Sequence, residues 1–189
     1  FASQCDRIES SSVISYAESV KKLLAIVVLG LLLSSCLVTT KEVTGTFETN
    51  MASWIKEKGN ANITGQAFLN QQGGGVVTCA GNYVTLTPVN SYSKERMQLI
   101  HGSTTKGYLS DVDQGFIKLT PEPPSSYYDL AKKTQCDAQG NFKFKNIPAN
   151  KEYFITTQVE WGTEWIKEGG WLMLKIKTEA NQTSEVILN

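Results

Sequence analysis

The sequence predicts an all-β protein, a single antiparallel β-sandwich preceded by a hydrophobic signal helix and a polar tether. Two observations predict the sandwich. Beyond residue 60, apolar and polar residues alternate in short runs, which is the period of a half-buried strand. Clusters of Gly, Pro and Asn separate these runs, and only one segment between them has helical features. A third observation, an apolar run of eleven residues at 23–33, predicts the signal helix.

The expected elements of the sandwich follow in chain order from residue 63. The opening strand, residues 63–68, alternates and ends at a Gln-Gln-Gly-Gly-Gly turn at 71–75. Residues 93–100 are expected to form the one helix, with Ser93 as a candidate N-cap. The other strands are expected at 76–79, 83–88, 116–120, 130–136, 141–144, 152–161, 170–178 and 184–188.

Two lysines at 21–22 precede the apolar run, which ends in Leu-Ser-Ser-Cys at 33–36. A helix of this length is about 16 Å long, whereas the hydrocarbon core of a bilayer is about 30 Å thick. The run is therefore too short to span a membrane unaided. Together these features resemble a bacterial lipoprotein signal peptide with its lipobox. An uncleaved anchor and a buried core helix are the alternatives.

The resemblance implies cleavage before Cys36 and attachment of diacylglycerol and an N-acyl chain such as palmitate to that cysteine. Several acyl chains anchor a protein stably, because each buried CH₂ contributes about 0.8 kcal/mol. The protein is then expected in the cell envelope, held to the lipid bilayer through acylated Cys36. In a Gram-negative bacterium the outer membrane is expected, on its periplasmic or surface face.

This interpretation divides the chain into four parts. Residues 20–35 are the signal peptide, and translation is expected to begin at residue 20, which makes 1–19 a spurious upstream extension. Residues 36–60 are expected to be the lipidated cysteine and a Thr-rich polar tether, with a short helix at 51–58. Residues 61–189 are the sandwich domain.

Two cysteines, Cys79 and Cys136, lie in the sandwich domain. In an exported domain two cysteines are predicted to form a disulfide, because the compartment is oxidising. The alternative is two unrelated buried thiols. Closing a loop of this length stabilises the fold by about 4 kcal/mol at most in the chain-entropy model.

Composition and motifs exclude several classes of function. The chain carries 18 basic and 18 acidic residues and no basic block outside the signal, so a nucleic-acid partner is not expected. His101 is the only histidine and is interpreted as a loop residue. Asp111 and Asp113 are interpreted as turn-forming acids rather than a calcium loop. No catalytic residue, cofactor or metal ligand is predicted.

A second resemblance covers about 18 residues. The run Cys-Asp-Ala-Gln-Gly-Asn-Phe-Lys-Phe at 136–144, followed by Asn-Ile-Pro-Ala at 146–149 and by Tyr153, resembles the signature of carboxypeptidase regulatory-like domains. Those domains are prealbumin-like (transthyretin-like) sandwiches, related in architecture to immunoglobulin-like folds, and are mostly non-catalytic accessory modules. The resemblance implies a hairpin turn at Asp137 and Gly140. Cys136 replaces the usual Thr, and the turn at Asn150 is longer than in the family.

The aromatic residues are the remaining functional clue. Trp161, Trp165 and Trp171 lie within eleven residues and could form a ligand surface, because indole faces stack on sugar rings. Alternatively, Trp161 and Trp171 cap the core. A non-enzymatic, membrane-anchored envelope domain that binds an envelope protein or a glycan, or supports the envelope, is the leading interpretation. A carbohydrate-binding module using the Trp cluster is the alternative. An enzyme would need His101 gathered with Glu95, Asp111 or Asp113.

Overall fold

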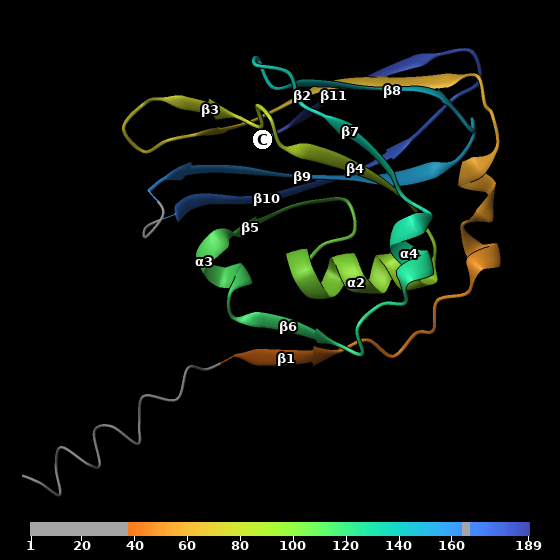
Figure 1. The fold of residues 1–189 in the computed structure, drawn as a ribbon, viewed down its shortest axis with the longest axis horizontal. Coiled ribbons are helices and arrows are strands. Elements are labelled where there is room, and N and C mark those ends of the chain that lie inside the picture. The colour runs from red at the N-terminus through yellow and green to blue at the C-terminus, as the bar shows by residue number, and fades with distance from the viewer. Residues whose placement is uncertain (1–37, 164–166) are drawn as a thin grey trace, which may run out of the picture. The chain divides into compact units, whose positions relative to one another are not determined.

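The computed structural model describes residues 38–163 and 167–189, and two sheets stack to form the predicted all-β sandwich (Figure 1). Helices cover the outer face of the larger sheet. Cys36, the signal helix and Trp165 lie outside the described residues, as does the expected extension at 1–19. Within the described ranges, no helix has the length and apolarity that membrane crossing demands.

The larger sheet has five strands, and every neighbouring pair in it is antiparallel. The long hairpin of β9 and β10 forms its centre, with an unbroken register from Gly162 opposite Lys167 to Glu152 opposite Lys177. In spatial order the strands are β5 (Lys106–Ser110), β10 (Lys167–Lys177), β9 (Glu152–Gly162), β4 (Tyr83–Pro88) and β7 (Lys132–Gln135).

The second sheet is built around β2 (Ala61–Asn70). Antiparallel to it run β8 (Asn141–Ile147) and β3 (Val76–Thr78), whereas β11 (Thr183–Leu188) pairs with it in parallel. The parallel pairing departs from the antiparallel prediction. Its reason is that the chain passes from β10 in one sheet to β11 in the other, so no hairpin fixes the strand direction.

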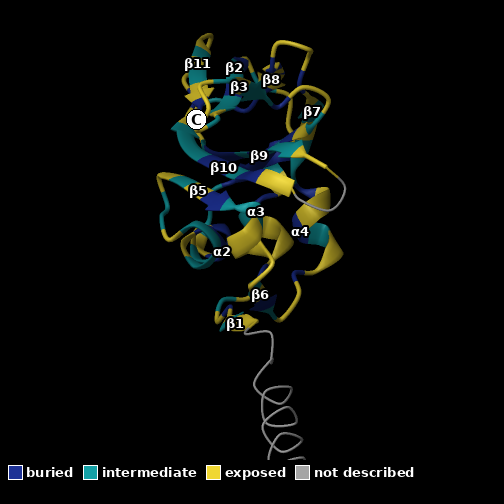
Figure 2. Ribbon diagram, turned by 90° about the vertical axis from the view of Figure 1, so that its left-hand side faces the viewer, coloured by how far each residue is buried: buried dark blue, intermediate teal, exposed yellow. Residues whose placement is uncertain are grey.

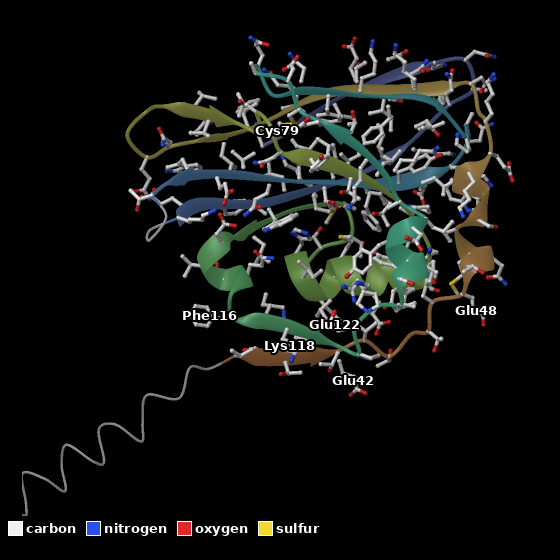
Figure 3. All side chains as sticks on the ribbon, viewed as in Figure 1. Glu42, Glu48, Cys79, Phe116, Lys118 and Glu122 are labelled. Atoms are coloured by element: carbon white, nitrogen blue, oxygen red, sulfur yellow. A yellow bond between two sulfur atoms is a disulfide. The ribbon has the colours of Figure 1, made fainter. Side chains whose placement is uncertain are left out.

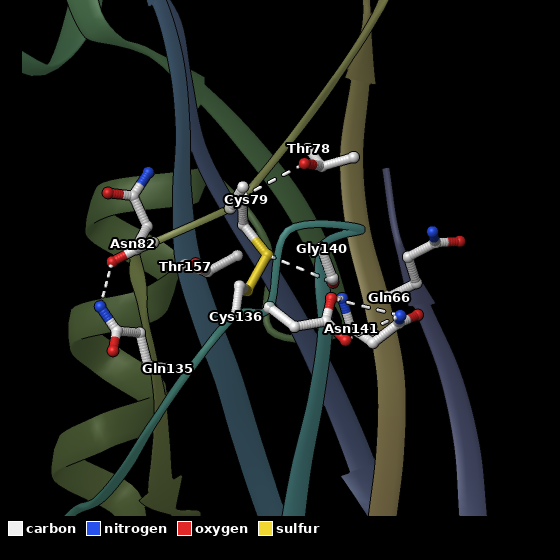
Figure 4. The surroundings of a disulfide bond; sticks show 12 residues. Gln66, Thr78, Cys79, Asn82, Gln135, Cys136, Gly140, Asn141 and Thr157 are labelled. Carbon is white, nitrogen blue, oxygen red and sulfur yellow. Dashed lines mark hydrogen bonds between the residues drawn. A yellow bond between two sulfur atoms is a disulfide. The ribbon is translucent and has the colours of Figure 1, made fainter.

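The core lies between the two sheets, and the predicted disulfide bridges it (Figure 4). Cys79 follows β3 of the second sheet and Cys136 follows β7 of the larger sheet, with Cα atoms 5.8 Å apart. Both cysteines are buried. The bridge therefore joins the two layers of the sandwich, and the predicted pairing is confirmed.

The turn before β8 forms at the expected residues, but it connects β7 of the larger sheet to β8 of the second sheet, so it is not the expected hairpin turn. The Asp137 carboxylate accepts hydrogen bonds from the backbone amides of Gln139 and Asn141, and Gly140 has φ of 78°. A Cβ on Gly140 would lie 2.6 Å from the Cβ of Thr78, so the turn needs glycine for space as well as for conformation. Downstream, the Tyr153 hydroxyl donates to the Pro148 carbonyl from within the core.

Three helices cover the outer face of the larger sheet: α2 (Ser91–His101), α3 (Asp111–Gln114) and α4 (Ser125–Asp129). The N-cap of α2 is Asn90, so the prediction of Ser93 is wrong. Asn90 accepts from the Ser93 amide, and the Ser93 hydroxyl accepts from the Asn90 amide, which forms a capping box. The helix therefore begins two residues before the predicted segment.

The segment before β2 is part of the domain, so the prediction of a tether is wrong for residues 38–60. β1 (Thr39–Glu42) pairs in parallel with β6 (Ile117–Thr120), and the 3-10 helices η1 (Thr49–Met51) and η2 (Ser53–Lys56) follow. The segment contributes the buried residues Val43, Phe47, Ala52 and Ile55, which are spaced too irregularly to give a periodic signal. Figure 2 shows that buried residues also lie along the central strands β9 and β10 of the larger sheet.

The surface of this segment is charged. Glu42 and Lys118 are exposed on the β1–β6 ribbon, and Glu48 is exposed farther along the segment (Figure 3). Behind the ribbon, the Glu95 carboxylate of α2 accepts hydrogen bonds from the Thr44 hydroxyl and from the Thr44 and Gly45 amides. These bonds hold the pKa of Glu95 below its usual range. The helix therefore fastens the N-terminal segment.

Candidate functional site

A cavity of about 310 Å³ lies between the outer face of the larger sheet and its helical cover. Its floor comes from β4, β7, β9 and β10, and its roof comes from α2 and α4. The floor presents Thr85, Thr87, Lys133, Thr156 and Trp171. The roof and walls present Arg96, Ile100, His101, Gln114, Tyr127 and Tyr128.

The sheet register explains the polar floor. Thr85 is paired with Lys133 on one side and with Thr156 on the other, and Thr156 is paired with Met173. Side chains of directly paired residues point to the same face of a sheet. The row that faces the helices therefore carries hydroxyl groups at its centre. No hydrogen bond of these threonine hydroxyls is found within residues 38–163 and 167–189, which leaves them available to a ligand.

Two aromatic groups border this floor. The Trp171 indole Nε1 donates to the Gln114 Oε1 at 2.8 Å, which anchors the half-buried ring to α3. On the other side Tyr127 is buried and Tyr128 is 52% exposed, with their ring centroids 5.5 Å apart. Burial raises the pKa of Tyr127 to about 12, although the nearby Arg96 charge opposes this effect. The tyrosine is therefore a neutral aromatic wall at neutral pH.

Arg96 lies in the roof among aromatic rings. Its guanidinium carbon is 5.7 Å from the Tyr92 ring centroid and 5.4 Å from that of Tyr127. It also interacts with the Tyr127 side chain, but its buried Nη1 has no hydrogen-bond partner. Cation–π contacts of this kind hold the guanidinium in position without satisfying its hydrogen-bond donors.

His101 is the last residue of α2 and lines the same cavity, which corrects its interpretation as a loop residue. Its Nδ1 is buried without a hydrogen-bond partner. Desolvation lowers the pKa of His101 to about 4. The imidazole is therefore neutral at pH 7 and offers one donor and one acceptor.

This environment predicts a pH effect on stability. Between the unfolded-state pKa of about 6.5 and the folded-state pKa of about 4, the unfolded chain binds a proton that the folded chain does not. The contribution of His101 to the free energy of unfolding therefore has its full value above pH 6.5 and decreases as the pH falls towards 4. Urea unfolding of His101→Gln should show a weaker pH dependence than the wild type over this window. An NMR titration that places the pKa of the single histidine near 6.5 would contradict the prediction.

The predicted tryptophan surface is not formed by the two indoles that the structure describes. Trp171 is paired with Gln158, three positions before Trp161 on β9. Because side chains alternate along a strand, Trp161 and Trp171 lie on opposite faces of the sheet. Trp161 packs against the core between the sheets, and its Nε1 donates to Glu168. Trp165 lies outside the described residues.

The acids considered for an enzyme are not gathered around His101. Glu95 binds Thr44 and Gly45, Asp111 accepts from the Gln158 amide, and Asp113 accepts from Ser110. Asp111 and Asp113 lie in the first turn of the short helix α3, as expected of turn-forming acids. Within residues 38–163 and 167–189 there is no cluster of three or more potential metal ligands.

Two hollows of more than twice the volume of the cavity beneath α2 lie elsewhere on the described surface and are more open. One, of about 710 Å³, runs along β2, β8 and β11, with Thr64, Asn141 and Glu185 in its lining. The other, of about 850 Å³, lies beside the β2–β3 loop and includes Trp161, Tyr108 and Lys167. Neither combines several aromatic rings with buried, unpartnered polar groups, so the cavity beneath α2 is the stronger candidate.

No protein-family model and no curated protein matches this chain. Among solved structures, the fold is similar to that of a "putative carbohydrate binding protein" from Pseudomonas aeruginosa, with a TM-score of 0.60. The two chains are 21% identical, and the match covers 76% of this chain and 97% of the other. The likeness shows that the two proteins share a fold, a β-sandwich.

Proposed function

We propose that this protein is a non-catalytic binding domain of the bacterial cell envelope that holds one sugar residue in the cavity beneath α2. The observation that carries the proposal is the juxtaposition of aromatic and hydroxyl groups in one hollow. Trp171 and Tyr128 offer ring faces, and Thr85 and Thr156 offer hydroxyl groups on the floor. Sugars need both, because their C–H faces stack on aromatic rings while their hydroxyls require hydrogen-bond partners.

The size of the cavity supports a single ring. The cavity volume of about 310 Å³ is at the lower end of the range for small-molecule sites, which begins at ~300 Å³. A longer glycan would bind with one residue inside and the remainder in solvent. The similar fold of the protein described as carbohydrate binding supports this class of ligand. In this proposal the ligand contacts Trp171 and the tyrosines of α4. It does not bind to a surface formed by Trp161, Trp165 and Trp171.

The envelope location rests on the resemblance of residues 20–36 to a lipoprotein signal. Lipidated Cys36 lies directly before the described domain, whose first strand begins at Thr39. The domain would therefore be held near the bilayer surface on a very short connection. Membership of the carboxypeptidase regulatory-like class is part of the same proposal, and the turn at Asp137 and Gly140 supports it.

Binding of methyl glycosides to the full-length chain in detergent tests the proposed site. We expect at least one member of a panel of neutral, amino and acidic monosaccharides to bind, measured by isothermal titration calorimetry. Trp171→Ala should weaken binding about tenfold, because an aromatic contact contributes about 0.5–1.5 kcal/mol beyond area burial. Trp161→Ala is the matched control, on the opposite face of the sheet, and should leave affinity unchanged.

Two results would contradict the proposed site. The first is an absence of measurable binding of every glycoside in the panel. The second is an equal loss of affinity in Trp161→Ala and Trp171→Ala, because only Trp171 lines the cavity.

A further inference from the structure

We infer that the sugar bound beneath α2 is acidic, with a carboxylate that pairs with Arg96. This inference rests on the proposed function and specifies its ligand. Arg96 is only 8% exposed, and its Nη1 is buried without a hydrogen-bond partner. Within the described ranges 38–163 and 167–189, no acid forms an ion pair with it. A buried charge of this kind is costly unless a partner compensates it.

The charge of the cavity is unbalanced. Arg96 and Lys133 both line it, whereas no Asp or Glu is among the lining residues that the structure describes. His101 adds no positive charge at neutral pH because burial keeps its imidazole neutral. The cavity therefore has a positive potential that an anion would neutralise, and a neutral sugar would leave this potential uncompensated.

The arrangement of Arg96 suits a carboxylate. Its guanidinium lies beside the rings of Tyr92 and Tyr127 and hydrogen-bonds to the Tyr127 side chain, while its buried Nη1 is left without an acceptor. A planar guanidinium donates two parallel hydrogen bonds to a carboxylate, and such charge-assisted bonds are about twice as strong as neutral ones. A carboxylate at Arg96 would supply the missing acceptor for Nη1.

The remaining cavity groups suit the rest of an acidic sugar. His101 lines the cavity as a neutral imidazole, and Thr85 and Thr156 present hydroxyl groups. These groups match the ring hydroxyls of a pyranose, while Trp171 and Tyr128 match its C–H faces. A uronic acid is a sugar in which a carboxylate replaces the C6 hydroxymethyl group. It combines the carboxylate, the ring hydroxyls and the C–H faces in one ring.

Calorimetry with two matched ligands tests this inference on the full-length chain in detergent. Methyl β-D-glucuronide and methyl β-D-glucoside differ only in the carboxylate. We expect the glucuronide to bind at least about tenfold more tightly at low salt, because hydrogen bonds to charged groups stabilise more than neutral ones do. The methyl ester of the glucuronide, which lacks the charge, should bind like the glucoside.

Variants assign the preference to Arg96. Arg96→Gln should bind both glycosides with equal, weak affinity, whereas Lys94→Gln, an exposed change on the same helix, should retain the wild-type preference. Circular dichroism checks that Arg96→Gln folds. If it does not, the ester comparison still tests the charge on an unchanged protein.

Each failure has a distinct meaning. Equal binding of glucuronide, ester and glucoside would overturn the acidic ligand and leave the proposed sugar site standing. A preference that persists in folded Arg96→Gln would overturn the role of Arg96. Inorganic phosphate that binds as tightly as the glucuronide, with the same dependence on Arg96, would overturn a sugar acid in favour of a phosphate ligand. Absence of binding by the whole glycoside panel would instead refute the proposed function.

Discussion

Replacing Cys79 and Cys136 together by alanine is expected to lower the free energy of unfolding by up to about 4 kcal/mol. The bridge closes a loop across a sequence separation of 57 residues, so its loss enlarges the unfolded ensemble. It also joins the second sheet, after β3, to the larger sheet, after β7. Both side chains are buried, so alanine is chosen because it introduces no unsatisfied polar group.

Urea unfolding followed by circular dichroism measures this effect. The wild type in a reducing agent provides the matched control, because it loses the crosslink while retaining both sulfur atoms. Its stability should fall close to that of the double variant. A loss below about 1 kcal/mol in both samples would contradict a crosslinking role for the disulfide.

Cys36→Ser is expected to abolish the lipidated form and to lower membrane retention strongly. Serine cannot form the thioether to diacylglycerol, and the attached acyl chains supply the binding energy at about 0.8 kcal/mol for each buried CH₂. Detergent phase partitioning of cell fractions is the measurement. The wild type should enter the detergent phase as the mature lipidated form. That form should be absent from Cys36→Ser, so much less of the variant should enter the detergent phase.

Cys5→Ser is the matched control for lipidation. Cys5 lies outside the Leu-Ser-Ser-Cys motif at 33–36, so this change should have no effect on partitioning. Equal retention of wild type and Cys36→Ser would contradict lipidation at Cys36.

Much of the sandwich could be predicted because its strands alternate. β4 and β9 begin where the sequence places them, and the turn at Asp137 and Gly140 marks the start of β8. The β5 strand was missed because it is short and contains Gly107. The parallel pair of β1 and β6 was missed because parallel partners are far apart in sequence and no local turn announces them.

The candidate site was harder to predict than the fold. Proximity in sequence suggested that Trp161 and Trp171 act together, but strand register sends them to opposite faces. The cavity gathers residues from Thr85 to Trp171, and only the tertiary structure brings them together. One signal was available: Thr85 and Thr87 alternate with buried Val84 and Leu86, which marks a polar face on a central strand.

NMR chemical-shift mapping with the tightest-binding glycoside would locate the ligand site directly. On the labelled full-length chain in detergent, we predict that the largest perturbations occur at the Trp171 indole, the Arg96 side chain and the Tyr128 amide. Residues around Trp161 and along the hollow that includes Thr64 should change little. Perturbations concentrated at Trp161 or Thr64, with none at Trp171 and Arg96, would contradict a ligand site beneath α2.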